Sequence, residues 1–310
     1  MRYKTLALSS NVPQVKRTEV DQDLVRSFTS EHDYMNLSVE LLIEASSYVC
    51  IAGNILPPAR KAWNRHEAVL VGHLVRLYKL NSALLDQTCQ HRRETTVIFA
   101  RLAFECIVNS LFLIRNDRSE IVQSYIEHSM RHEKRLQDRI QANIKARSGE
   151  IWPIEERMLA SIKRSAKKSE VDLDSFDPPK NWAGKNLFDK AQEVGFGEAY
   201  LGTFAGPSHS VHGNWQDLLE HLLEVVDGGF LPDFEWHTPR PQLLTTIAHL
   251  TIITLDEFFS EIIGPAGSAV AEMLPDLNER VKRLVQLHEE FLATRTKGDK
   301  TSGISNKLTS

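Results

Sequence analysis

Residues 97–114 read VIFARLAFECIVNSLFLI, and this stretch decides the fold class. It is apolar on almost every side over five helical turns, which is typical of a helix in the centre of a protein core. Arg101 and Glu105 interrupt it, whereas a membrane span needs about 20 mostly apolar residues without such interruptions. The sequence therefore predicts a buried central helix in a soluble protein, with no membrane partner.

The rest of the chain repeats the helical pattern. Apolar residues recur at three- and four-residue spacing, and no alternating run bounded by turns is typical of a strand. We therefore expect an all-α, multi-helix bundle around 97–114, with no sheet of three or more strands. The expected parts are a flexible lead-in (1–20), a bundle domain (21–264) with a peripheral basic hairpin and loop (131–180), a C-terminal helix (265–293) and a disordered tail (294–310).

Two features of composition bear on compartment and chemistry. The formal net charge is -4, and the hydrophobic and charged shares of 42% and 25% are ordinary for a globular protein. The three cysteines, Cys50, Cys89 and Cys106, form no CxxC pair and lie in apolar helical contexts. They predict buried free thiols in a reducing cytoplasm, and neither disulfides nor a zinc site.

Positive charge is concentrated in Arg131–Lys168, which holds eleven Lys and Arg residues against five Asp and Glu residues. Such a block is one mark of a nucleic-acid contact, and RNA is the candidate partner. A solvated hairpin with basic faces explains the same block. Only Trp152 supplies an aromatic ring there, which favours weak, sequence-indifferent binding. A homodimer or another protein partner is also open.

The central helix carries Arg101, Glu105 and Asn109 at i, i+4 and i+8, so the three share one face. A buried charge is costly unless it is paired. Arg101 and Glu105 are therefore expected to pair with each other or to meet polar groups of another helix. The stripe is either a structural pair that fixes helix register or part of a reactive site.

A second polar stretch, AGPSHSVHGNW (205–215), supplies imidazoles. His209 and His212 lie at i and i+3, and imidazole serves as acid or base near neutral pH. We expect His212, more than His209, to face Arg101 and Glu105, because the apolar helix that follows must dock on the core. There His212 would move protons, Arg101 would stabilise a developing anion and Glu105 would orient the imidazole. Alternatively, His212 only caps a helix end or bonds to Glu105.

Familiar cofactor and metal motifs are missing from the sequence. His128 and His132 have the i, i+4 spacing of a metal pair, but Ser129 follows His128 where HExxH has its glutamate. The sequence contains no GxGxxG, Walker or GxSxG motif. We therefore expect no cofactor and no bound metal.

Two segments, RLAFECIVNSLFLI and NWAGKNLFDKAQEVGFGEAYLGTFAGPSHSVHG, together resemble a bacterial all-helical family catalogued as domain of unknown function 5677. The resemblance covers about residues 65–263. It implies that the family's motif positions are the following residues: Arg101, Glu105, Trp182, Tyr200, Ser208 and His212.

A more distant resemblance is to HEPN domains, helical bundles that include ribonucleases of defence systems. Their signature is an arginine four to six residues before a histidine on one helix, and no arginine precedes His212 in this way. The resemblance implies a metal-independent ribonuclease or an RNA-associated module in a defence or stress setting. Its candidate catalytic residues are His212, Arg101, Glu105 and His209. The alternative is a non-catalytic interaction scaffold whose Arg/Glu/His cluster is structural.

Overall fold

The computed structural model describes residues 13–56, 60–116, 118–174, 181–206 and 208–305. These residues are mainly helical and contain one two-stranded sheet, which confirms the all-α, multi-helix class. The chain divides into two compact units. Residues up to Ile114, together with those from Ala191 onward, form the larger unit, and Arg115–Lys190 form the smaller one.

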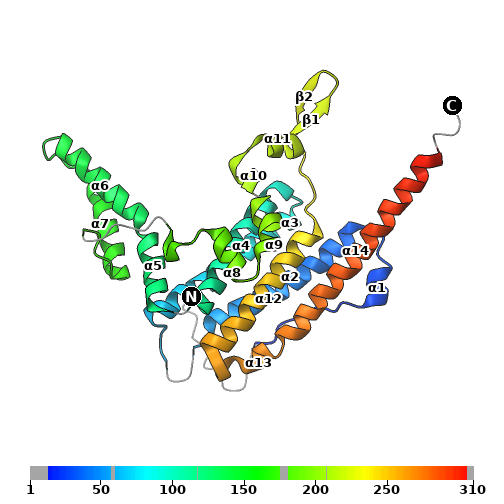
Figure 1. Cartoon of the computed structure of the whole chain (residues 1–310), viewed down its shortest axis with the longest axis horizontal. Helices are drawn as coiled ribbons and strands as arrows, with labels where there is room; N and C mark the ends of the chain where they lie inside the picture. Colours follow the sequence, from blue (N-terminus) through cyan, green and yellow to red (C-terminus); the bar gives the residue numbers. More distant parts are fainter. Residues whose placement is uncertain (1–12, 57–59, 117, 175–180, 207, 306–310) are drawn as a thin grey trace. The chain divides into compact units, whose positions relative to one another are not determined.

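Four long helices make the frame of the larger unit: α2 (Glu31–Asn54), α3 (Arg65–Cys89), α12 (Pro241–Phe258) and α14 (Leu274–Ser305). α12 packs against both α2 and α14, and α2 also packs against α3. Figure 1 shows α2, α12 and α14 as long rods lying side by side. Asn64 caps α3 and accepts from the Glu67 amide, which fixes the start of this helix at Arg65.

Shorter elements complete the larger unit. They are α1 (Gln22–Arg26), α9 (Gly197–Tyr200), η2 (Leu201–Ala205), α10 (Ser208–His212), α11 (Trp215–His221), β1 (Leu223–Val226), β2 (Gly229–Pro232), η3 (Phe259–Ile263), η4 (Gly264–Gly267) and α13 (Ser268–Ala271). α8 (Leu187–Glu193) continues from the smaller unit into this one.

Helix α4 (Arg93–Arg115) contains the stretch that decides the fold. Phe104, Ile107 and Leu111 are fully buried, and its polar stripe of Arg101, Glu105 and Asn109 is only half-buried. This confirms the expected central apolar helix. Because the charges lie at the edge of the core, they keep contact with solvent and with the neighbouring segment.

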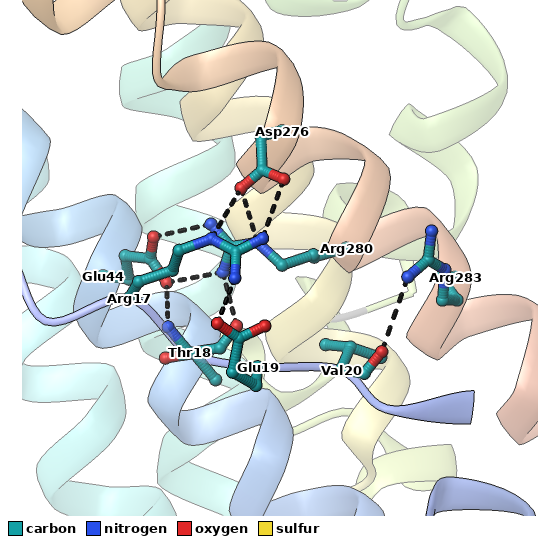
Figure 2. A network of polar contacts seen from close by, with 8 residues as sticks. All are labelled: Arg17, Thr18, Glu19, Val20, Glu44, Asp276, Arg280 and Arg283. Carbon is teal, nitrogen blue, oxygen red and sulfur yellow. Dashed lines mark hydrogen bonds and ion pairs between the residues drawn. The ribbon is translucent and has the colours of Figure 1, made fainter. Parts of the chain in front are cut away.

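The expectation of a flexible lead-in is wrong for residues 13–20, the part of it that the structure describes. The Thr18 amide donates to Glu44 Oε2 at 2.8 Å, and the Thr18 carbonyl accepts from Arg280 at 2.6 Å. Figure 2 shows Arg17 reaching Asp276 and Arg283 reaching Val20 beside this contact. The segment looked loose because its partners lie on α2 and α14, far away in the sequence. Residues 1–12 lie outside the described part of the chain.

A β-hairpin replaces part of an expected helix. The apolar spacing after Asn214 predicts one helix that continues to a stop at Gly228-Gly229, but α11 ends at His221 and β1 pairs antiparallel with β2, Val226 facing Gly229. The β-branched Val225 and Val226, followed by an Asp-Gly turn, favour this arrangement over a helix. Gly228 adopts φ 85° in that turn. No larger sheet occurs among the described residues, as expected.

The C-terminal helix is longer than the sequence predicts. Helix α14 continues to Ser305, past the expected end at residue 293, and 306–310 lie outside the described residues.

All three cysteines are free; Cys106 is buried as expected, whereas Cys50 and Cys89 are exposed. The expectation of buried thiols is therefore wrong for those two, which lie on the solvent faces of their helices.

Three helical segments are long and apolar enough to cross a membrane by length and composition: Glu31–Asn54, Arg93–Arg115 and Pro241–Ala271. In each, more than half of the most apolar window is buried inside the protein. The absence of a membrane partner thus stays a prediction.

The smaller unit is built from α5 (Ser119–Ser129), α6 (Arg131–Ala146), α7 (Pro153–Ser169) and η1 (Trp182–Gly184). α6 and α7 pack together as the expected hairpin. Its own small core consists of Met130, Ile140, Ile162, Ala166 and Leu173. Because the apolar faces of α6 and α7 turn to this core, their basic side chains turn outward.

Candidate functional site

Arg101 is held by the segment that carries the histidines. Its Nε donates to Ser208 Oγ at 3.0 Å, and its guanidinium carbon lies 4.2 Å from the centre of the Phe204 ring. Among the described residues no ion pair joins Arg101 to Glu105. Of the two alternatives, Arg101 therefore meets a polar group of another helix. These contacts fix the start of α10 on α4.

Several positions of the sequence motif come together around Arg101. The Tyr200 ring lies 5.0 Å from Phe204 and 6.4 Å from Phe104, between centroids. Tyr200, Ser208 and Arg101 therefore belong to one cluster. Trp182 belongs to the smaller unit, where its ring lies 5.3 Å from Tyr125.

His212 does not face inward, so this expectation is wrong. The side chain is exposed, as is that of Val211. The expectation assumes that the apolar side of the following helix docks on the core, but α11 buries Asp217 and His221, and Leu222 directly after it is exposed. In addition, residues 201–205 form a π-helical turn, which widens the helix and rotates the residues that follow. The catalytic role of His212 stays a prediction.

His209 is the histidine of this pair that lines a cavity. The cavity has a volume of about 310 Å³ and is also lined by Arg93, Arg240, His221, Asp217 and Glu220. The Asn214 side-chain amide contacts His209 Nδ1 and orients the ring. When Nδ1 accepts this hydrogen bond, the neutral imidazole carries its proton on Nε2.

The two arginines give this cavity a positive wall. Burial lowers the pKa of Arg93, and the like charge of Arg240 lowers it further, while Glu220 and Glu94 oppose the change. A guanidinium stays protonated even so. The positive charges of Arg93 and Arg240 repel each other at the cavity wall, and an anion bound between them would offset this repulsion.

A second cavity, of about 350 Å³, adjoins the first and shares Ser210, Asp217 and His221 with it. Glu94 and Asp233 also line it. Here one oxygen of Glu94 and one ring nitrogen each of His221 and His237 lie within 4.8 Å of one another. This set of donors could hold a metal ion, and the expectation of no bound metal stays a prediction.

Residues 233–240 form a connector that brings His237 and Arg240 to the N-terminal end of α4. The Arg93 amide donates to the His237 carbonyl at 2.8 Å, and His237 Nδ1 lies 2.7 Å from Glu94 Oε1. The Arg92 guanidinium carbon lies 5.2 Å from the centre of the Trp236 ring. Sequence reasoning missed Arg93, Glu94, His221, His237 and Arg240, because no local spacing relates residues so far apart in the chain.

Comparison with known proteins gives one match. A family model described as "Family of unknown function (DUF5677)" matches residues 67–230, more than half of the chain. The matched range includes Arg93, Arg101, His209 and His221 and ends before His237 and Arg240. No curated protein matches. No solved structure matches either. The resemblance to HEPN domains therefore stays a prediction.

Proposed function

The chain belongs to the DUF5677 family, whose function is unknown, and we propose that it is a metal-independent, HEPN-like ribonuclease whose reaction site is the 310 Å³ cavity. The observation that carries the proposal is the joint lining of that cavity by His209, Arg93 and Arg240. An imidazole beside two guanidiniums is a set of groups suited to acid–base cleavage of a phosphodiester.

The proposed reaction needs a ribose 2′ hydroxyl. His209 Nδ1 gives up its hydrogen bond from Asn214 and takes the hydroxyl proton, and the oxygen attacks the adjacent phosphorus. The bond from phosphorus to the 5′ oxygen breaks, and that oxygen takes a proton from water. Arg93 and Arg240 stabilise the charge that develops on the phosphoryl oxygens. The products are a 2′,3′-cyclic phosphate and a 5′ hydroxyl, and DNA is inert because it lacks the nucleophile.

This proposal changes the roles of the candidate residues that the sequence suggested. His209 takes the acid–base role first expected of His212, because His209 lines the cavity and His212 is exposed. Arg101 acts as a positioning residue, since its bond to Ser208 fixes the residue next to His209. Glu105, on the same helix face, supports that arrangement.

The basic hairpin completes the proposal as an RNA contact. The outward side chains of Arg131–Lys168 bind phosphates without reading bases. Such an activity belongs in the cytoplasm, where RNA is available and free thiols persist. A defence or stress setting is the physiological role that we propose.

A second candidate function is the non-catalytic interaction scaffold. One observation favours it: the hydrogen bond that Arg101 makes is with Ser208, inside the fold. In that case the residues around Arg101 serve to hold α10 on α4, and the cavity has no catalytic use.

The test is incubation of the purified full chain with a short RNA and with its all-deoxy counterpart, followed by product mapping. We expect cleavage of the RNA alone, with cyclic phosphate ends. His209→Ala and Arg240→Ala should each lower the rate at least 100-fold, as for loss of a proton-transfer or charge-stabilising group. His66→Ala, at the start of α3, is the matched control. An intact RNA in the wild-type reaction supports the scaffold instead.

A further inference from the structure

A cluster of one carboxylate and two imidazoles lies beside the proposed cleavage site. Glu94 comes from the first turn of α4, His221 from the end of α11 and His237 from the connector. Their donor atoms lie within 4.8 Å of one another. His221 and Glu94 are mostly shielded from solvent, with 8% and 14% of their side chains exposed.

Two of the donor atoms lack partners within the described part of the chain. Glu94 Oε2 and His221 Nδ1 are both buried without a hydrogen bond. A buried polar atom without a partner costs about 1–3 kcal/mol, so such atoms call for an explanation. An unpartnered carboxylate oxygen and an unpartnered ring nitrogen in one cluster are groups that a cation would bind.

The outer nitrogens of both histidines face carboxylates. His221 Nε2 lies 3.8 Å from Glu220 Oε2, and His237 Nε2 lies 3.8 Å from Asp233 Oδ2. A histidine that binds a metal usually donates its other ring N–H to a carboxylate, and these two carboxylates lie close enough to take that role after a small movement. In the metal-free chain His237 Nδ1 donates to Glu94 Oε1 at 2.7 Å, so a cation would replace that proton, whereas His221 Nδ1 has no hydrogen-bond partner within the described residues.

We propose that Glu94, His221 and His237 form a binding site for one divalent first-row transition ion, zinc being the best match. Two histidines and one glutamate are a common zinc ligand set, and the two nitrogens exclude magnesium and calcium, which take oxygen ligands. Tetrahedral ligands with bonds of about 2.0 Å lie about 3.3 Å apart, so on binding the 2.7 Å contact between His237 and Glu94 opens and any pair farther apart than this closes. The fourth position opens to the 350 Å³ cavity, which admits water and the ion.

The ion takes no direct part in the proposed cleavage, so metal binding and cleavage can be measured separately. Its effect is to tie three segments together: the start of α4, the end of α11 and the connector. Arg240 lies three residues beyond His237, so the ion holds one of the two guanidiniums of the cavity in place. Binding to the folded chain alone also stabilises the fold.

The test is titration of the chelator-treated full chain with Co²⁺, followed by visible absorption, and then with Zn²⁺. We expect one equivalent of Co²⁺ in an N/O-ligand spectrum, its displacement by Zn²⁺, and a Tm that rises with Zn²⁺ and not with Mg²⁺. Glu94→Gln and His237→Asn should lose the spectrum. Asp233→Asn, which keeps all three ligands, should weaken binding 10- to 100-fold.

The matched control is His132→Asn, which breaks the i, i+4 pair of His128 and His132 and should bind Co²⁺ like the wild type. Circular dichroism of each variant separates lost binding from lost folding, and Asp233→Asn decides the matter if a ligand variant does not fold. A wild type that binds neither ion, or a His237→Asn chain that binds as well as the wild type, overturns the site. His209→Ala should lose RNA cleavage and keep the metal, so failure of either inference leaves the other standing.

Discussion

Glu44 and Arg280 form a buried ion pair that joins α2 to α14 across 236 residues of sequence, with contacts of 2.8 and 2.7 Å. The two side chains are 2% and 4% exposed. Removal of one partner leaves a buried charge without compensation.

Arg280→Ala should therefore lower the free energy of unfolding by about 3–5 kcal/mol, measured by urea denaturation. Lys282→Ala, which removes an exposed ion pair one turn away, is the control and should cost less than about 1 kcal/mol. The double change Glu44→Leu/Arg280→Met should cost less than Arg280→Ala alone, because no charge is left buried. Equal losses for Arg280→Ala and the control would contradict this account.

The buried His73 predicts a pH dependence of stability. Burial, and then the charge of Arg76, lower the pKa of His73 to about 4, from 6.5. The unfolded chain thus binds a proton at a higher pH than the folded chain does. The stability due to neutral His73 is complete above pH 6.5 and is lost as the pH falls towards 4, by on the order of 3 kcal/mol.

The measurement is the free energy of unfolding of wild type and His73→Gln at pH 7.5, 5.5 and 4.5. The variant should show a flatter profile over this window, whereas the exposed His212→Gln should follow the wild type. Parallel profiles for all three proteins would rule out His73 as the source.

Arg101 and Ser208 should be energetically coupled. Because Arg101 is only half-buried, Arg101→Ala should cost about 1–2 kcal/mol, less than the 3–5 kcal/mol expected of a sealed pair. A double-mutant cycle with Ser208→Ala should give a coupling energy of about 0.5–1.5 kcal/mol. The cycle of Arg101 with the exposed His212 should give none; a larger coupling there would mean that the contact is wrongly assigned.

The basic hairpin should bind RNA through charge alone. Replacement of Lys163, Arg164, Lys167 and Lys168 by Ala should weaken retention of a single-stranded RNA at least tenfold and flatten the dependence of affinity on salt, because fewer counterions are released. Filter binding over a series of salt concentrations measures both. The control replaces the exposed Lys282 and Arg295 of α14. If the four-residue variant retains RNA as tightly as the wild type, the hairpin is not the contact.

The frame of the fold could be predicted from sequence because helical periodicity is a local signal. The apolar run of α4 and the recurrence of apolar residues at three- and four-residue spacing needed no distant information. The hairpin at 223–232 was missed although its Val-Val and Asp-Gly signals are local, since the leucines before it also match a helical stripe. The strand propensity of the two valines and the Asp-Gly turn favour the hairpin over the helix that the leucine spacing predicts.

The candidate site was less predictable, for a geometric reason. The π-helical turn at 201–205 changes which histidine faces the protein, and the sequence LGTFA contains no signal that predicts such a turn. Glu94, His221 and His237 meet only because the connector folds back on α4. Sequence spacing finds ligands on one helix, and these three lie on separate segments.

The docking of Thr18 implies that a segment without helix or strand behaves as part of the frame. Its amide proton is bound to Glu44, and that carboxylate is also held by Arg280. To exchange this proton with deuterium, the chain must separate α14 from α2 and expose Glu44. Residues that look like a loop in a ribbon drawing should therefore exchange as slowly as the long helices, and the described N-terminal segment and α14 should open in one cooperative step.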